Sequence, residues 1–162
     1  MRHLYDLGHR HLVYLDGPPE SASNRDRQAG LAEMQRIYGD LVVDRVPAGA
    51  SSESGAAAAA AVQASSATAA VAYNDLVAIG LMNGLLERGV RVPEDISVTG
   101  FDDIPFARYT TPPLTTASVP HEELGVQAWQ RMRALLADET PGHDVVFQPR
   151  LEQRASTAEV RA

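Results

Sequence analysis

The sequence predicts an α/β protein with a doubly wound parallel sheet. Short apolar runs alternate with helix-length segments in the order strand, helix, strand, helix, strand, helix, strand. This alternation implies right-handed crossovers, which make the strands parallel and place helices on the faces of the sheet. A length of 162 residues and a hydrophobic content of 44% fit a single folded domain.

The first third of the chain contains two predicted strands with a helix between them. Residues 11–15 are apolar and run into Asp16-Gly17-Pro18, which predicts a buried strand that ends in a turn. Residues 24–38 carry apolar side chains at helical spacing, with Gly39 as the stop. Residues 41–46 then read as a second strand.

The middle of the chain repeats this pattern. The stretch 51–54, Ser-Ser-Glu-Ser, is a helix-start signal, and the six alanines that follow form helix readily and allow close packing on a sheet. Residues 68–73 predict the third strand. Asn74-Asp75 then begins a helix that ends at Gly89.

The last third is less regular. Residues 96–101 predict the fourth strand, residues 114–119 are extended, and residues 145–154 have room for one or two short strands. The polar tail from Ser156 is predicted to be frayed.

Residues 122–137 predict an amphipathic helix. Its apolar stripe includes Trp129, which we interpret as a buried packing residue. A stripe of this size needs a cover, so the helix is expected either to fold back on its own lobe or to dock on a second copy of the chain.

Composition excludes several classes of function. The net charge of −7 argues against direct binding of nucleic acid, whose phosphates attract basic surfaces. The chain has no Cys and no Lys, which removes thiolate catalysis, Cys-ligated zinc, Schiff bases and the phosphate-loop lysine. No apolar run approaches the length that spans a bilayer, so a cytoplasmic location is expected.

Cofactor and catalytic signatures are also missing from the sequence. No Gly-x-Gly-x-x-Gly follows the first strand, and Gly49 to Glu53 does not complete the pattern of a nucleophile elbow. His9 and His11 lack an acidic third ligand nearby, which favours structural or solvated roles over a metal site. We therefore predict no catalytic residue, no cofactor and no metal, and hence no enzyme.

Polar residues follow three of the predicted strands, at Asp16-Gly17-Pro18, at residues 73–75 and at residues 101–103. Open parallel sheets bind ligands outside the carboxyl ends of their strands, so these residues are the first candidates for a site. We expect one of Asn74 and Asp75 to cap the following helix and the other to face a ligand. Asp102 is interpreted as a ligand acceptor rather than a simple turn residue.

Arg25 and Arg27 stand in the first turns of their helix, where cations oppose the helix dipole. A guanidinium beside Asp and Asn suits the recognition of sugar hydroxyls or of a carboxylate. A surface salt bridge is the equally weighted alternative.

These motifs together resemble the C-terminal half of a LacI/GalR-type transcription regulator, from about residue 2 to residue 157. The residues that carry the resemblance are Leu7-Gly8-His9-Arg10, Asp16-Gly17-Pro18-Pro19, residues 21–30, Asn74-Asp75-Leu76-Val77-Ala78-Ile79-Gly80, residues 91–98, Gly100-Phe101-Asp102-Asp103 and Pro112-Pro113-Leu114-Thr115-Thr116.

The resemblance implies one lobe of a periplasmic-binding-protein-like effector domain, usually dimeric, which closes on a small molecule such as a sugar. It assigns Arg27 to gripping the effector, Asn74 and Asp102 to hydrogen bonding it, and Ser21 and Ser23 to the loop that lines the cleft. By analogy, the helix at 121–138 belongs to an N-terminal lobe that residues 1–162 do not contain. The DNA-binding headpiece also has no counterpart here, so operator DNA is expected as a partner only through it. A binding module outside transcription, such as a solute sensor, is the alternative.

Overall fold

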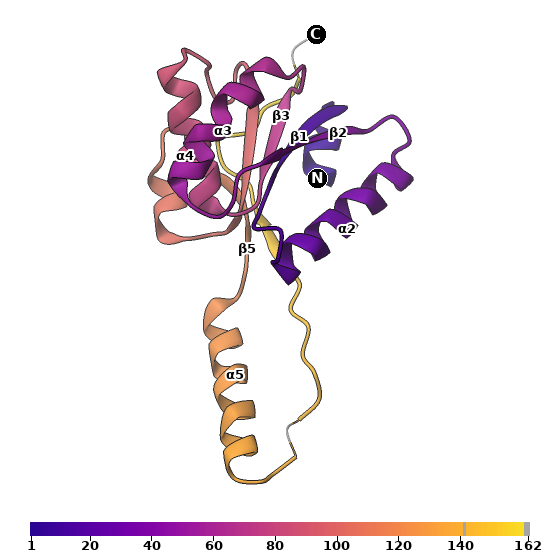
Figure 1. The fold of residues 1–162 in the computed structure, drawn as a ribbon, viewed down its shortest axis with the longest axis vertical. Helices are drawn as coiled ribbons and strands as arrows, with labels where there is room; N and C mark the ends of the chain where they lie inside the picture. The colour runs from indigo at the N-terminus through magenta and orange to yellow at the C-terminus, as the bar shows by residue number, and fades with distance from the viewer. Residues whose placement is uncertain (141, 161–162) are drawn as a thin grey trace.

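A computed structural model describes residues 1–140 and 142–160 of the chain. Its centre is one six-stranded sheet with the strand order β2-β1-β3-β4-β5-β6 (Figure 1). The strands are β1 (His11–Asp16), β2 (Val42–Pro47), β3 (Ala69–Ala72), β4 (Ser97–Asp102), β5 (Thr115–Ser118) and β6 (Arg150–Glu152), and the helices are α1 (Arg2–Asp6), α2 (Ala22–Ile37), α3 (Ser52–Ala64), α4 (Asp75–Glu87), the 3₁₀ helix η1 (Pro105–Tyr109) and α5 (His121–Leu136).

The predicted fold class is confirmed. The first five strands pair in parallel, and only β6 runs antiparallel, beside β5. Because β1, β3 and β4 are neighbours and point the same way, their carboxyl ends share one edge of the sheet. Every strand boundary expected from the sequence lies within two residues of the observed one through β5, whereas only three residues of the stretch 145–154 form a strand.

Alternating side chains of the central strands build two cores. Val13 and Leu15 of β1 face α3 and α4 in the larger core, while Leu12 faces α1 in a smaller one. Helices therefore lie on both faces of the sheet, with α3 and α4 on one side and α2 on the other (Figure 1). A search of residues 1–140 and 142–160 finds no helix with the length and hydrophobicity that a membrane span requires.

Helices α3 and α4 approach each other at backbone distance. A Cβ atom added at Gly80 of α4 would collide with the carbonyl oxygen of Ser52, at the start of α3. Only glycine leaves room for this approach. The alanines of α3 serve the same purpose, since Ala58 and Ala59 are buried in the shared core.

Helix α5 does not fold back on its lobe, so that part of the expectation is wrong. The helix stands below the sheet, joined to it by β5 and by the returning chain before β6 (Figure 1). None of its residues is buried, and Trp129, expected to be a packing residue, is 65% exposed. An amphipathic pattern shows that a face needs a cover, but it does not identify the cover.

The tail from Ser156 to Val160 is held by hydrogen bonds, so the expectation that it is frayed is wrong for these residues. Ser156 is fully buried; its hydroxyl donates to the Val98 carbonyl at 2.6 Å and accepts from the Thr115 N–H at 2.8 Å. Further along, the Val160 N–H donates to the Leu7 carbonyl. Polar residues can be ordered in a core when backbone groups satisfy them, and a polarity count does not detect this.

Substitution of Gly80 by Ala is expected to destabilise the fold by about 2 kcal/mol, because overpacking outweighs the gain in helix propensity. Gly30→Ala in α2 is the matched control: its added Cβ would meet nothing within 4 Å, so we expect stabilisation by about 0.5–1 kcal/mol. Urea unfolding of both variants measures the difference. Equal effects would contradict the close approach of α3 and α4.

Candidate effector site

The candidate site lies where β1, β3 and β4 end. Of the polar residues at these ends, Asp16 is committed to internal contacts: Arg45 binds both of its carboxylate oxygens at 2.9 and 3.0 Å, and Gln28 donates to it at 2.8 Å. The groups that remain for a ligand come from α2, β4 and the residue after β3.

Arg27 is the most unusual side chain in the site. Its guanidinium carbon lies 4.5 Å from the ring centroid of Tyr73 and 4.1 Å from that of Phe101. Its Nε and Nη1 atoms are buried and have no hydrogen-bond partner among the described residues. Burying a polar group without a partner costs about 1–3 kcal/mol, and more for a charged group. The predicted alternative of a surface salt bridge does not occur, because no ion pair of the described residues includes Arg27.

Tyr73 and Phe101 lie in the stretches 73–75 and 101–103, which were the first candidates for a site, but neither residue was given a ligand-binding role. Both are aromatic, and both stand at the ends of adjacent strands, which is the signal that could have assigned them one. The Tyr73 hydroxyl lies 3.0 Å from the Ser21 Oγ, so α2 and β3 are joined just beside Arg27. Stacking between two rings holds the guanidinium without using its N–H donors.

Ser21 and Ser23 lie at the start of α2. Ser21 caps the helix by accepting from the Asn24 N–H at 3.3 Å, whereas Ser23 is exposed in the first turn. Asn24 is buried and fixes this segment: Tyr14 donates to its Oδ1, and its amide nitrogen donates to the Gly17 carbonyl. The segment before α2 is thereby tied to β1.

The expectation that one of Asn74 and Asp75 caps the following helix is confirmed, but the expectation that the other faces a ligand is wrong. Asn74 caps α4 through its Oδ1, which accepts from the Val77 N–H at 2.9 Å, and its amide nitrogen donates to the Ala50 carbonyl at 3.1 Å. Asp75 is not left free for a ligand, because it is fully buried and hydrogen-bonded inside the protein. Asn74 is only partly buried, so it remains at the edge of the site.

Asp102 differs from its neighbour Asp103. No hydrogen bond of the described residues involves the Asp102 carboxylate, whereas Asp103 accepts from Arg154 at 2.5 Å. Burial raises the pKa of Asp102, and the nearby Asp75 carboxylate raises it further. Arg27 and His121 act in the opposite direction. The Asp102 carboxylate and the Arg27 guanidinium thus lie close enough to interact electrostatically, and neither forms a hydrogen bond within the described residues.

A cavity of about 430 Å³ borders Arg27 and Phe101 on the α1 and α2 face of the sheet. Ser21, Ser23, Asn74 and Asp102 are not among its lining residues. Of the sequence-predicted site residues, Arg27 therefore borders the cavity, and the other four lie outside its lining.

A Ser–His–Asp chain of contacts exists elsewhere. His11 lies 2.8 Å from Asp44 and 3.1 Å from Ser66. These residues join β1, β2 and the chain before β3, near the amino ends of the strands, away from the candidate site. His9 is buried against Thr68 and the Ala158 carbonyl, as a structural histidine. No cluster of metal-ligating residues occurs in the part of the chain that the structure describes.

Residues 1–157 match the model of the periplasmic binding protein-like domain family. A curated relative, an HTH-type transcriptional regulator of Streptomyces limosus, is 36% identical over 98% of this chain. The match covers 47% of that relative, so the chain spans about half its length.

Solved structures agree with these two matches. A LacI family transcriptional regulator from Enterococcus faecalis with bound ribose superposes with a TM-score of 0.87 at 28% identity, over 99% of this chain and 59% of that one. The lac repressor dimer bound to operator and an anti-inducer has a TM-score of 0.86 at 30% identity, over 97% and 56% of the two chains.

Asp102→Asn is expected to raise the melting temperature at pH 7. The folded-state pKa of Asp102 lies above the unfolded value of 3.8, so ionisation costs stability as pH rises through this range. The amide removes that cost, and the gain disappears near pH 3, where both states are protonated. Thermal unfolding against pH measures it.

Asp103→Asn is the matched control. It weakens a mostly buried ion pair with Arg154, so it is expected to lower stability by at least about 1 kcal/mol. If Asp102→Asn also lowered the melting temperature at pH 7, the Asp102 carboxylate would have an internal partner and the ligand role would lose its support.

Proposed function

Because the chain belongs to the LacI family of transcriptional regulators, we propose that it forms the effector-binding lobe of such a regulator and takes a sugar or a related polyhydroxy metabolite. Two observations carry this proposal: the buried Arg27 guanidinium has no hydrogen-bond partner among the described residues, and the half-buried Asp102 carboxylate at the end of β4 accepts no hydrogen bond from them. The rival role as a solute sensor outside transcription has no comparable support.

The chemistry of this pair favours neutral hydroxyls. A sugar hydroxyl donates to a carboxylate and accepts from a guanidinium, so neighbouring hydroxyls satisfy both groups together. The two charges balance, which disfavours a strongly anionic ligand. Asn74 at the edge and the Ser21 hydroxyl add polar contacts, and Ser23 is assigned to the rim. The ribose in the Enterococcus faecalis regulator supports this class of ligand.

Control of transcription would require a DNA-binding part in addition to residues 1–162. We propose that operator DNA is contacted by a headpiece outside residues 1–162, in agreement with the acidic charge of −7 on this lobe. The site binds its ligand without turning it over, in the cytoplasm, where the operator is found. Purified chain is then expected to leave operator-like DNA unshifted in a gel.

Helix α5 is assigned to the N-terminal lobe of the regulator. Its apolar side chains, including Trp129, Met132 and Leu135, are exposed and suit a second lobe as their cover. The returning chain adds the exposed Val145 and Val146 to the same arm. Residues 121–138 thus work with a lobe outside this chain.

The homodimer is proposed to form through α4 and η1. Leu86, Phe106 and Tyr109 expose 69%, 71% and 78% of their surface, although each is large and apolar. A groove between α4 and the chain after η1, lined by Met82, Leu86 and Pro112 among others, continues this face. The dimer seen in the lac repressor supports a second copy as the occupant.

A ligand panel of sugars, sugar phosphates and nucleosides tests the effector proposal by thermal shift. A ligand at 100 times its dissociation constant is expected to stabilise the chain by about 2.7 kcal/mol. Arg27→Ala is expected to abolish that stabilisation because it removes the unpartnered donors.

Arg25→Ala is the control in the same helix. Arg25 is exposed and contacts the Glu20 carbonyl, so its removal leaves the effector shift intact. A hit that Arg27→Ala retains, or that both variants lose, would contradict the assigned site.

Sedimentation velocity tests the dimer face. The double variant Phe106→Ser and Tyr109→Ser is expected to shift the chain to monomer, because it removes two exposed aromatic contacts. Trp129→Ser on α5 is the control and is expected to leave the dimer unchanged. Loss of the dimer in the α5 variant alone would place the interface on the arm.

A further inference from the structure

The turn after β4 has an unusual backbone. Asp102 and Asp103 have φ angles of 121° and 58°, so two consecutive residues other than glycine adopt positive φ. Side chains with a Cβ atom rarely take this conformation, and it persists only where surrounding contacts determine it. The direction of the Asp102 side chain therefore depends on what holds this turn.

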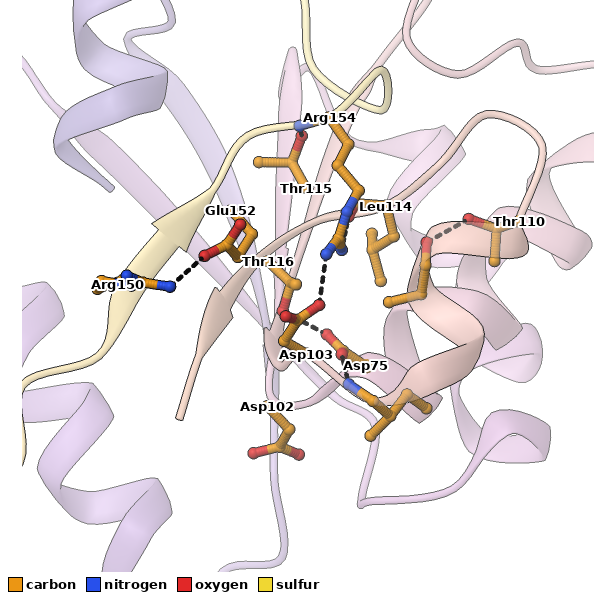
Figure 2. A network of polar contacts seen from close by, with 12 residues as sticks. Asp75, Asp102, Asp103, Thr110, Leu114, Thr115, Thr116, Arg150, Glu152 and Arg154 are labelled. Atoms are coloured by element: carbon orange, nitrogen blue, oxygen red, sulfur yellow. Dashed lines mark hydrogen bonds and ion pairs between the residues drawn. The ribbon is translucent and has the colours of Figure 1, made fainter. Parts of the chain in front are cut away.

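Asp75 lies directly beneath the turn. It is fully buried in the first turn of α4, and its Oδ2 accepts a hydrogen bond from the Ile104 N–H at 2.9 Å. Its Oδ1 accepts from the Thr116 hydroxyl of β5 at 2.6 Å. Figure 2 shows the carboxylate between the turn and β5, with the Asp102 side chain pointing away from both.

The sheet leaves space for this carboxylate. A Cβ atom at Gly100 would collide with Asp75 Oδ1, and Gly100 is the residue of β4 that pairs with Thr116. The side chain of α4 can therefore cross β4 and reach β5. The missing side chain at Gly100 therefore makes room for the Asp75 carboxylate beneath the turn after β4.

Two contacts hold the turn from other sides. Arg154 binds Asp103 at 2.5 Å and also donates to the Leu114 carbonyl at 2.8 Å. The Nε2 of His121 donates to the Asp102 carbonyl at 3.0 Å. Neither contact reaches the Ile104 N–H, which depends on Asp75.

We propose that Asp75 is a positioning residue of the effector site, which holds the turn after β4 so that the Asp102 carboxylate faces the ligand together with Arg27. This inference rests on the proposed function, since Asp102 matters as an acceptor only if a ligand binds there. The proximity of the two carboxyl groups agrees with it, because Asp75 raises the pKa of Asp102.

Nuclear magnetic resonance of the full chain tests the proposal without a ligand. The first readout is hydrogen exchange of the Ile104 amide. The second is the Nε–H resonance of Arg27, which senses the charge of Asp102 and is assigned through Arg27→Lys. Asp102→Asn gives the reference shift for a changed carboxylate.

Asp75→Ser removes the two carboxylate oxygens that accept hydrogen bonds from the Ile104 N–H and the Thr116 hydroxyl. It is expected to speed Ile104 exchange by about tenfold or more and to move the Arg27 resonance in the direction of Asp102→Asn. Asp75→Asn is expected to restore both signals, since its amide oxygen can accept from Ile104 while its nitrogen donates to Thr116. Asp44→Asn removes a carboxylate near the amino ends of the strands and is expected to move neither signal.

Faster Ile104 exchange with an unmoved Arg27 resonance would make Asp75 a structural residue only and overturn the proposal. The proposal would also be overturned if Asp75→Ser and Asp75→Asn changed the Ile104 exchange and the Arg27 resonance equally. If Asp75→Ser does not fold, Thr116→Val decides, because it releases one carboxylate oxygen and keeps the side-chain shape: both signals move if the proposal holds and stay if it fails. A ligand panel without hits would count against the proposed function and leave this result standing.

Discussion

Backbone contact between α3 and α4 is the constraint on which the candidate site depends. Gly80 allows α4 to lie against the start of α3, so α4 cannot slide along its axis without a collision. The first turn of α4 is therefore fixed relative to the sheet edge. That turn carries Asn74 as its cap and Asp75 beneath β4, and the position of Asp102 follows from theirs. A packing requirement among small residues thus helps to determine where Asn74, Asp75 and Asp102 lie.

The site separates charges that serve the fold from charges that remain available. Asp16 is paired with Arg45 and Asp103 with Arg154, and both pairs tie segments of the lobe together. Arg27 and Asp102 have no such internal partner in the part of the chain that the structure describes. The unpartnered donors of Arg27 and the partial burial of the Asp102 carboxylate both cost stability, and functional sites are where folded proteins accept this cost.

The fold could be predicted from the sequence because each element carries a local signal. Apolar runs bounded by turn residues mark β1 and β4, and Ser and Asn caps mark the starts of α3 and α4. The location of Asp102 could be predicted from the topology, since parallel strand ends share an edge, whereas Arg27 was identified by its place in the first turns of a helix and by the family resemblance. The stacking of Arg27 on Tyr73 and Phe101 could not be predicted, because it joins a residue of α2 to two residues far along the chain. The burial of Asp75 was missed because its partners, Ile104 and Thr116, lie far along the chain.

The antiparallel pairing of β5 with β6 has a consequence for the architecture of the lobe. Ser118 pairs directly with Arg150, so the two strands end opposite each other at the point where the arm begins. Residues 119–149 are in effect a long insertion at the tip of a β-hairpin. A two-residue turn such as Asn-Gly could close that hairpin in its place. The sheet is thus complete without residues 119–149, which form the arm. A change in the length or sequence of this arm would leave the order and pairing of the strands unchanged.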